Sequence, residues 1–256
     1  MSEIRNTLSV FKARCPEVIL LIGLRILALL SSVQVQVPET ARESKEGLPF
    51  VIFSVSVTVI ATILMFGFLR TVYLEGKRQC EPIVLLITGR RFFLRLLVFS
   101  LLLAVVFIPL FVVTFLSLEM FVFANPDFVN RSIWIHELSM VLPMIVLLKP
   151  VLLIPALIIV LDCGLIQSLN LLKICVISRE NELLGLYILQ ILLPLIWLFF
   201  NVPFEPKTIP EYVLLIASSG FGYLVSLMIA VIAVRYVATV DLVYDGETDS
   251  HIKKIR

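Results

Sequence analysis

Six long apolar stretches constrain the fold of this chain more than any other feature. Each is long enough to cross a hydrocarbon core about 30 Å thick, because a helix rises about 1.5 Å per residue. The connections between them carry the turn residues and nearly all of the charge. The stretches are Val18–Val37, Phe50–Leu69, Leu94–Leu118, Met144–Leu161, Leu183–Phe200 and Tyr212–Val240. This pattern predicts an all-α fold, a polytopic transmembrane helical bundle with six spans.

The composition agrees with a membrane protein and disagrees with a soluble one. Of the 256 residues, 60% are hydrophobic and 16% are charged, whereas a soluble domain has about 45–50% apolar and about 25% charged residues. The six spans leave room for short connections, so we expect residues 1–256 to form a single integral membrane domain. The net charge of +2 is too small to favour binding to nucleic acid.

The lysines and arginines are distributed unevenly between the two predicted sides of the membrane. Fifteen of the 21 fall on one side, at the chain ends, in the second and fourth connections or at the span ends beside them; four lie in the other connections, and Arg25 and Lys149 lie further inside spans. Basic residues near spans favour the cytoplasmic side. We therefore expect both termini in the cytoplasm.

The first apolar stretch follows basic residues, as the apolar part of a secretory signal peptide also does. Arg25 interrupts this stretch, and no clear small-x-small cleavage site accompanies it. We expect the stretch to be retained as the first span.

The fourth apolar stretch is the least regular of the six. Together with the apolar residues before it, it would form a helix about 43 Å long, which exceeds the thickness of the hydrocarbon core. Three prolines interrupt it, namely Pro143, Pro150 and Pro155. We expect Arg131–Leu142 to form an interfacial helix and Met144–Leu161 to form a kinked span. A single, steeply tilted helix is the alternative.

The residues that carry catalysis or bind metals do not form a recognisable motif. The four cysteines fall on the predicted cytoplasmic side, where thiols stay reduced. The two histidines, His136 and His251, fall on opposite sides, and His136-Glu137 lacks the second histidine of a zincin helix. No phosphate-binding loop or nucleophile elbow is present. We expect no metal and no cofactor, and we disfavour an enzyme.

Two basic residues lie within predicted spans. A charge at the membrane centre costs about 2.5–3.5 kcal/mol on insertion scales, so such residues are functional candidates. Arg25 and Lys149 are the candidate intramembrane polar sites. Their long side chains extend to the headgroups in one interpretation, which we prefer, and line a path for an anion in the other.

The second and fourth connections combine basic residues with apolar segments. In Cys163–Arg179, four apolar residues at helical spacing predict an amphipathic helix on the membrane surface: Leu165, Leu169, Leu172 and Val176. Basic residues at the cytoplasmic surface attract anionic lipids, each with about 1 kcal/mol. The candidate lipid-headgroup contacts are Lys77, Arg78, Arg90, Arg91, Arg95, Lys173 and Arg179.

Loose patterns in the same two connections carry a resemblance to a known family. The patterns are Leu69-Arg70…Glu75-Gly76-Lys77 and Ile154–Gln167-Ser168…Ser178-Arg179…Leu183-Leu184-Gly185. Over roughly its central half, the chain resembles six-span bacterial integral membrane proteins of uncharacterised activity, which are similar to the membrane domain of some glycerophosphodiester phosphodiesterases. The family's alanine before the serine of the surface helix is replaced here by Gln167. The resemblance implies a six-helix bundle in a bacterial inner membrane without assigned catalytic residues.

Two functional hypotheses follow from these features. In the first, the chain is a non-catalytic membrane protein that acts through contacts with membrane lipids, or with other membrane proteins, at the cytoplasmic leaflet. In the second, it is a transporter or permease component for an anionic or lipid-like substrate, with Arg25 and Lys149 along the path. The two halves of the chain show no clear repeat, which favours the first hypothesis.

Overall fold

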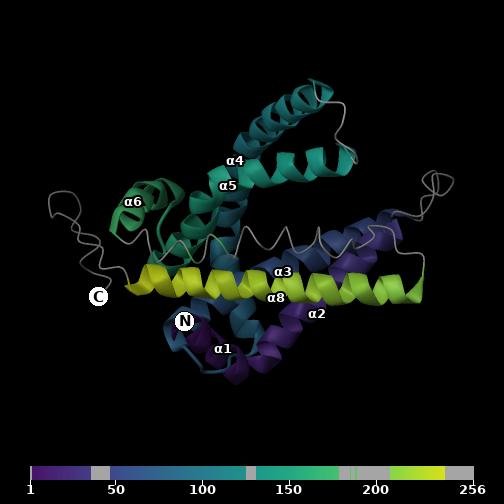
Figure 1. Cartoon of the computed structure of the whole chain (residues 1–256). Helices are drawn as coiled ribbons and strands as arrows, with labels where there is room; N and C mark the ends of the chain where they lie inside the picture. The colour runs from purple at the N-terminus through teal and green to yellow at the C-terminus, as the bar shows by residue number, and fades with distance from the viewer. Residues whose placement is uncertain are drawn as a thin grey trace.

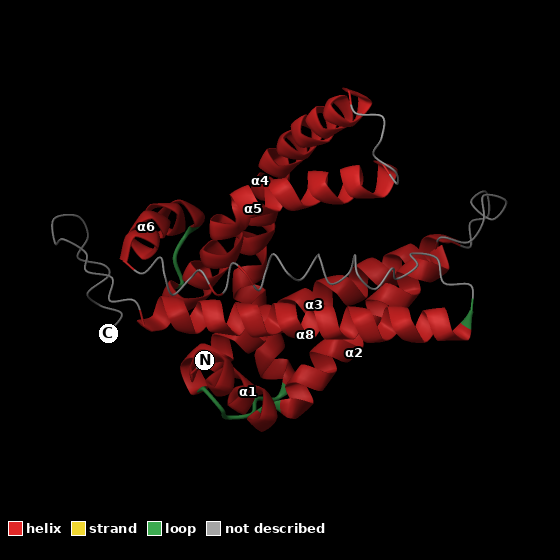
Figure 2. Cartoon of the chain, in the orientation of Figure 1, coloured by secondary structure: helices red, strands yellow, loops and turns green. Residues whose placement is uncertain are grey.

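The computed structural model describes residues 2–35, 47–124, 131–178 and 208–239, together with Gly185 and Ile188. Within these residues the chain is helical and contains no strand (Figures 1 and 2). The helices are α1 (Ser2–Ala13), α2 (Cys15–Val35), α3 (Gly47–Glu75), α4 (Pro82–Ala124), α5 (Arg131–Leu161), α6 (Leu165–Ser178) and α8 (Ile209–Thr239). The predicted all-α fold is confirmed for this part of the chain.

Four helices are long and apolar enough to cross a membrane. They are Pro49–Glu75 in α3, Pro82–Met120 in α4, Leu142–Leu161 in α5 and Ile209–Ala238 in α8. They correspond to the second, third, fourth and sixth predicted spans, and they are consistent with an integral membrane protein. The first predicted span falls on α2, which is not among the four, and the fifth, Leu183–Phe200, lies outside the described residues except for two positions. Six spans therefore remain a prediction.

The helix α5 differs from the expected arrangement of the fourth span. It continues from Arg131 to Leu161 without a break and contains all three prolines, so the prediction of a separate helix ending at Leu142 was wrong. Each proline removes one backbone hydrogen bond, which bends a helix without ending it when neighbouring helices support it. Figure 1 shows α5 changing direction along its length.

The helix α4 also begins earlier than expected. It starts at Pro82, whereas the sequence predicted a span from Leu94 with a separate basic segment before it. Proline suits the first turn of a helix, because the backbone amide that it lacks would have no partner there. Arg90, Arg91 and Arg95 are therefore held on a continuous helix, which fixes their spacing.

The protein core lies at one end of the helical bundle. The second halves of α3, α5 and α8 meet the first half of α4 there, and Phe68, Phe92, Leu157 and Leu227 are buried among them. The other end of α4 is exposed, and its Met120 is 76% exposed. In Figure 1 this part of α4 and the first half of α5 run away from α3 and α8.

Two glycines bring α3 and α4 into backbone contact. A Cβ atom at Gly67 of α3 would overlap the carbonyl group of Leu85, and one at Gly89 of α4 would overlap the carbonyl oxygen of Ile63. Glycine removes this obstacle, as small residues do at close helix crossings in membranes. The turn between the two helices begins at Gly76, whose φ of 63° suits glycine.

A buried ion pair joins α1, α2 and α3. The chain bends between α1 and α2 at Arg14 (Figure 1), whose side chain is fully buried. Its guanidinium lies 2.5 Å from the Glu17 carboxylate, donates to Thr71 Oγ1 at 2.8 Å and stacks over the ring of Phe68. Glu17 Oε1 in turn accepts a hydrogen bond of 2.6 Å from the backbone amide of Cys80. The pair thus fixes the N-terminal helices to the turn between α3 and α4.

Candidate functional site

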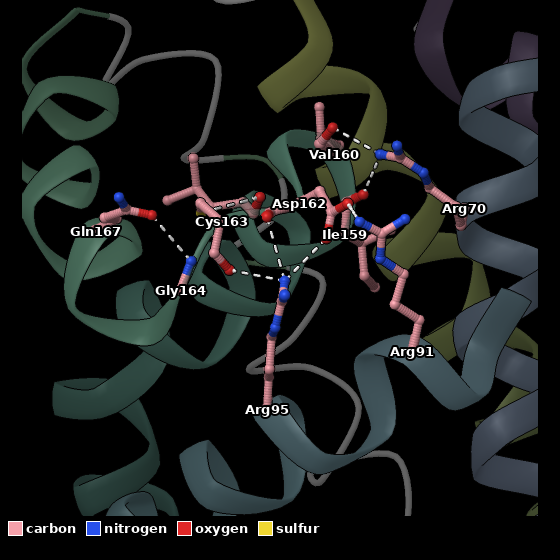
Figure 3. A network of polar contacts seen from close by, with 10 residues as sticks. Arg70, Arg91, Arg95, Ile159, Val160, Asp162, Cys163, Gly164 and Gln167 are labelled. Atoms are coloured by element: carbon pink, nitrogen blue, oxygen red, sulfur yellow. Dashed lines mark hydrogen bonds and ion pairs between the residues drawn. The ribbon is translucent and has the colours of Figure 1, made fainter. Parts of the chain in front are cut away.

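The helix α5 ends in an unusual backbone conformation. Asp162, the residue after Leu161, has a φ of 53°. This left-handed conformation is uncommon outside glycine but is tolerated by aspartate. It ends α5 and turns the chain towards Gly164, whose amide donates to Gln167 Oε1 at 3.1 Å (Figure 3). The last carbonyl groups of α5 are therefore left for partners from other helices.

Arg70 of α3 supplies one of those partners. Its Nη1 donates to the carbonyl oxygens of Ile159 at 2.5 Å and Val160 at 2.7 Å. Its guanidinium also lies over the rings of Tyr73 and Phe92. A cation at the C-terminal end of a helix is stabilised by the partial negative charge there. Arg70 is thus held against the end of α5.

Two arginines of α4 meet the Asp162 carboxylate. Arg95 Nη1 donates to Asp162 Oδ1 at 2.8 Å and reaches the carbonyl oxygens of Asp162 at 3.2 Å and Cys163 at 3.4 Å. Arg91 Nη2 forms an ion pair with Asp162 Oδ2. Figure 3 shows the two side chains approaching Asp162 from the same helix. Because they are four residues apart, they lie on one face of α4. We call Arg70, Arg91, Arg95 and Asp162 the arginine cluster.

The arginine cluster carries more positive charge than its own carboxylate neutralises. Two guanidinium groups contact the one carboxylate, and a third, that of Arg70, binds the neighbouring carbonyl oxygens of Ile159 and Val160. Each guanidinium has five N–H donors, yet in the described part of the chain each makes its polar contacts through one terminal nitrogen only. The side chain of Arg91 is 66% exposed. The cluster therefore has the charge and the donors to bind an additional anion, and arginine suits phosphate, which it contacts with two parallel hydrogen bonds.

The other predicted contacts of the second connection lie outside this cluster. Lys77, Arg78 and Arg90 are all exposed. Arg78 lies 3.9 Å from the Glu75 carboxylate, with 82% of its side chain exposed. The structure thus brings together Arg91 and Arg95 from the predicted set and leaves these three on the surrounding surface.

The remaining predicted sites are placed as follows. Arg25 is exposed on α2, and Lys149 is half-buried in α5. Lys173 lies in α6, but its side chain is not among those described, and Arg179 lies outside the described residues. The two intramembrane candidates therefore lie on different helices with different burial.

A helix, α6, lies where the sequence predicted a surface helix, and Leu165 and Leu172 of the predicted apolar stripe pack against the protein core. Ser168 and Leu171 are buried, whereas Leu169, which belongs to the predicted apolar stripe, is 44% exposed. The hydroxyl of Ser168 donates to the carbonyl oxygen of Leu165 at 2.7 Å, which makes its burial tolerable. The position of α6 on a membrane surface stays a prediction.

Cys163 adjoins the arginine cluster and gives a test of its burial. Its thiol donates to the carbonyl oxygen of Leu157 at 3.6 Å, and burial raises the pKa of this thiol. Cys15 is exposed. Because the thiolate is the reactive form and burial also limits access of the reagent, we expect Cys163 to react more slowly than Cys15 near neutral pH.

Single-cysteine variants that retain only one of the two thiols, treated with a small maleimide across a pH series, measure this difference. The rate at Cys163 should be the lower of the two in the folded protein, and the difference should disappear in denaturant. Equal rates and equal pH profiles would contradict the burial of Cys163.

The sequence indicated part of the cluster and missed the rest. Arg91 and Arg95 followed from charge counting, whereas Arg70 entered only the count of basic residues and the family pattern, and Asp162 was not among the candidate sites. One signal could have identified Asp162: it is the first acidic residue after an uninterrupted apolar run, so it marks where a helix leaves the membrane.

Comparisons with family models, with curated proteins and with solved structures found no match to this chain. The resemblance to six-span bacterial membrane proteins therefore stays a prediction. Among the described residues, no group of three or more histidine, cysteine, aspartate or glutamate side chains lies close enough together to hold a metal ion.

Proposed function

We propose that this chain is a six-span integral membrane protein of a bacterial inner membrane, with both termini in the cytoplasm, and that it binds anionic lipid headgroups at the arginine cluster. The proposed role is non-catalytic. The observation that carries it is the surplus of guanidinium groups around Asp162 in a chain whose apolar helices are long enough to cross a membrane.

The position of the cluster along the spans supports a headgroup ligand. The apolar part of α5 ends at Leu161, directly before Asp162, and that of α3 ends at Glu75, five residues after Arg70. Ends of spans lie at the level of the lipid phosphates. The uneven distribution of basic residues favours the cytoplasmic leaflet, where anionic lipids attract them.

A purely structural role for the cluster would require fewer arginines. Arg70 already caps the carbonyl groups of α5, and Arg95 already pairs with Asp162. Arg91 adds a third guanidinium that is two-thirds exposed, and an exposed ion pair of this kind contributes about 0–1 kcal/mol to stability. Because Arg91 contributes little to stability, lipid binding is the role that we propose for it.

The transporter hypothesis receives less support. An enclosed path for an anion would bury the side chain of Arg25, because the charge acts on the anion only where water and lipid are excluded. The exposure of Arg25 favours a side chain that reaches the headgroups instead.

We expect the variant Arg91→Ala to bind phosphatidylglycerol about fivefold more weakly than the original protein, since each basic residue near the surface adds about 1 kcal/mol. Binding of phosphatidylcholine should not change. Titration of each lipid into the purified protein, with bound lipids counted by native mass spectrometry, measures both affinities. Arg78→Ala is the matched control, because Arg78 is equally basic and more exposed but lies outside the cluster. An equal loss of affinity in both variants would show that binding depends on general surface charge, and it would contradict a specific site at the arginine cluster.

A second variant separates lipid binding from helix capping. Asp162→Asn removes the carboxylate that competes with a lipid phosphate for Arg91 and Arg95, so phosphatidylglycerol should bind more tightly. The same titration measures the change, with circular dichroism as the control for folding. Unchanged or weaker binding by a folded Asp162→Asn protein would contradict competition at this site.

A further inference from the structure

The helix α1 has three distinct faces, which helical geometry separates by about 100° per residue. Thr7, Val10 and Phe11 are buried and form the face that packs against the protein. Phe11 meets the ring of Phe68 in α3 edge to face, with 6.3 Å between the ring centroids. This face holds α1 against the protein. The other two faces do not pack against the described part of the chain.

The second face of α1 is apolar and basic. Ile4 and Leu8 are 40% and 51% exposed and lie one turn apart. Arg5 and Lys12 are exposed two turns apart beside them. The third face carries Asn6, which is exposed, and Ser9, whose hydroxyl donates to the carbonyl oxygen of Asn6 at 2.7 Å. Apolar side chains flanked by cations, with polar residues behind them, are typical of helices that lie in a membrane interface.

The connection of α1 to α2 places this face near lipid. The apolar stretch of α2 begins at Val18, only five residues after α1 ends at Ala13. The turn between the two helices is at Arg14, and the buried contacts of Arg14 with Glu17 and Thr71 hold it. The helix α1 is therefore fixed at the start of α2, on which the first predicted span falls.

We propose that α1 is an interfacial helix that inserts Ile4 and Leu8 into the anionic leaflet, with Arg5 and Lys12 at the lipid phosphates and Asn6 towards water. The occupant of the exposed face is the lipid around the chain's own spans, because its two cations complement anionic headgroups. This inference does not depend on the arginine cluster, from which it differs in helix and in residues.

Accessibility of two positions on the same helix tests the proposal. In a protein whose native cysteines are replaced by serine, Asn6→Cys and Leu8→Cys are introduced separately. Both residues are exposed, so neither change disturbs the packing against α3. The proteins are placed, one copy each, in lipid nanodiscs that leave both membrane faces accessible, and the rate of labelling by a water-soluble maleimide is measured.

In discs that contain phosphatidylglycerol, we expect Leu8→Cys to react at least about tenfold more slowly than Asn6→Cys, because burial in lipid excludes the reagent. The two should react equally in denaturant. Adding Arg5→Gln and Lys12→Gln should raise the rate at Leu8→Cys. Equal rates at both positions in the discs would overturn the proposal. Protection that persists unchanged in phosphatidylcholine discs would overturn the assignment to an anionic leaflet.

Discussion

Replacing Gly89 by alanine is expected to lower the free energy of unfolding by about 3 kcal/mol or more, at the upper end for a single methyl group added to a packed site. The added Cβ would overlap the carbonyl oxygen of Ile63. Backbone atoms cannot rotate away as the end of a side chain can, so α3 and α4 must separate. Separation would also move Arg70 away from Arg91 and Arg95, because Arg70 is on α3 and the other two are on α4.

The matched control is Gly23→Ala in α2, where a Cβ would meet nothing within 4 Å. Alanine favours a helix over glycine by about 1 kcal/mol, so this variant should be as stable as the original protein or slightly more stable. Denaturant unfolding in detergent, followed by circular dichroism, compares the two. If Gly89→Ala unfolds at the same denaturant concentration as Gly23→Ala, the backbone contact between α3 and α4 is wrong.

Replacing Glu17 by alanine is expected to cost about 3–5 kcal/mol, the usual effect of removing one partner from a buried ion pair. Among the described residues, the buried guanidinium of Arg14 would keep the hydrogen bond to Thr71 and the ring of Phe68 but no charged partner. It is already poorly satisfied, because Nε and Nη1 have no hydrogen-bond partner in the described part of the chain. The change would also leave the backbone amide of Cys80 without its acceptor.

A double substitution distinguishes the pair from its parts. Arg14→Met together with Glu17→Leu removes both charges while keeping apolar volume, and such replacements are often neutral or stabilising. We expect the double variant to unfold at a higher denaturant concentration than Glu17→Ala. If the double variant is the less stable of the two, the ion pair itself stabilises the fold. The cost of Glu17→Ala would then not come from leaving the charge of Arg14 buried without a partner.

The predictions from the sequence succeeded where a property depends on a continuous segment. Length and apolar character are local, so α3, α4, α5 and α8 were recognised as spans. The ends of α4 were misplaced because charge was taken as a sign of a loop. Arg91 and Arg95 lie on a helix because arginine is itself a good helix former, and Asp162, far along the chain, pairs with both.

The features that position the site depend on contacts between distant segments. The crossing of Gly67 and Gly89 involves two helices, and no spacing within either one indicates it. The pairing of Arg14 with Glu17 could be read as two exposed charges near the N-terminus, since only the fold determines that they are buried. The continuity of α5 through three prolines likewise depends on the helices that pack around it.

The arginine cluster links the fold to the proposed role. Asp162 ends α5 in a left-handed turn, Arg70 covers the last carbonyl groups, and Arg91 and Arg95 bind the carboxylate. Capping and the proposed ligand binding would therefore use the same residues. A lipid phosphate bound there would join three helices at their membrane ends, so anionic lipid should also stabilise the fold by mass action.

Photocrosslinking locates such a lipid most directly. A phosphatidylglycerol that carries a photoreactive group at its headgroup is incubated with the purified protein, irradiated, and mapped by mass spectrometry of the peptides. We predict crosslinks in residues 90–95 of α4 and in the segment after Leu161, both of which Arg91→Ala should reduce and unlabelled phosphatidylglycerol should displace. Crosslinks that fall elsewhere on the chain, or that Arg91→Ala leaves unchanged, would contradict lipid binding at the arginine cluster.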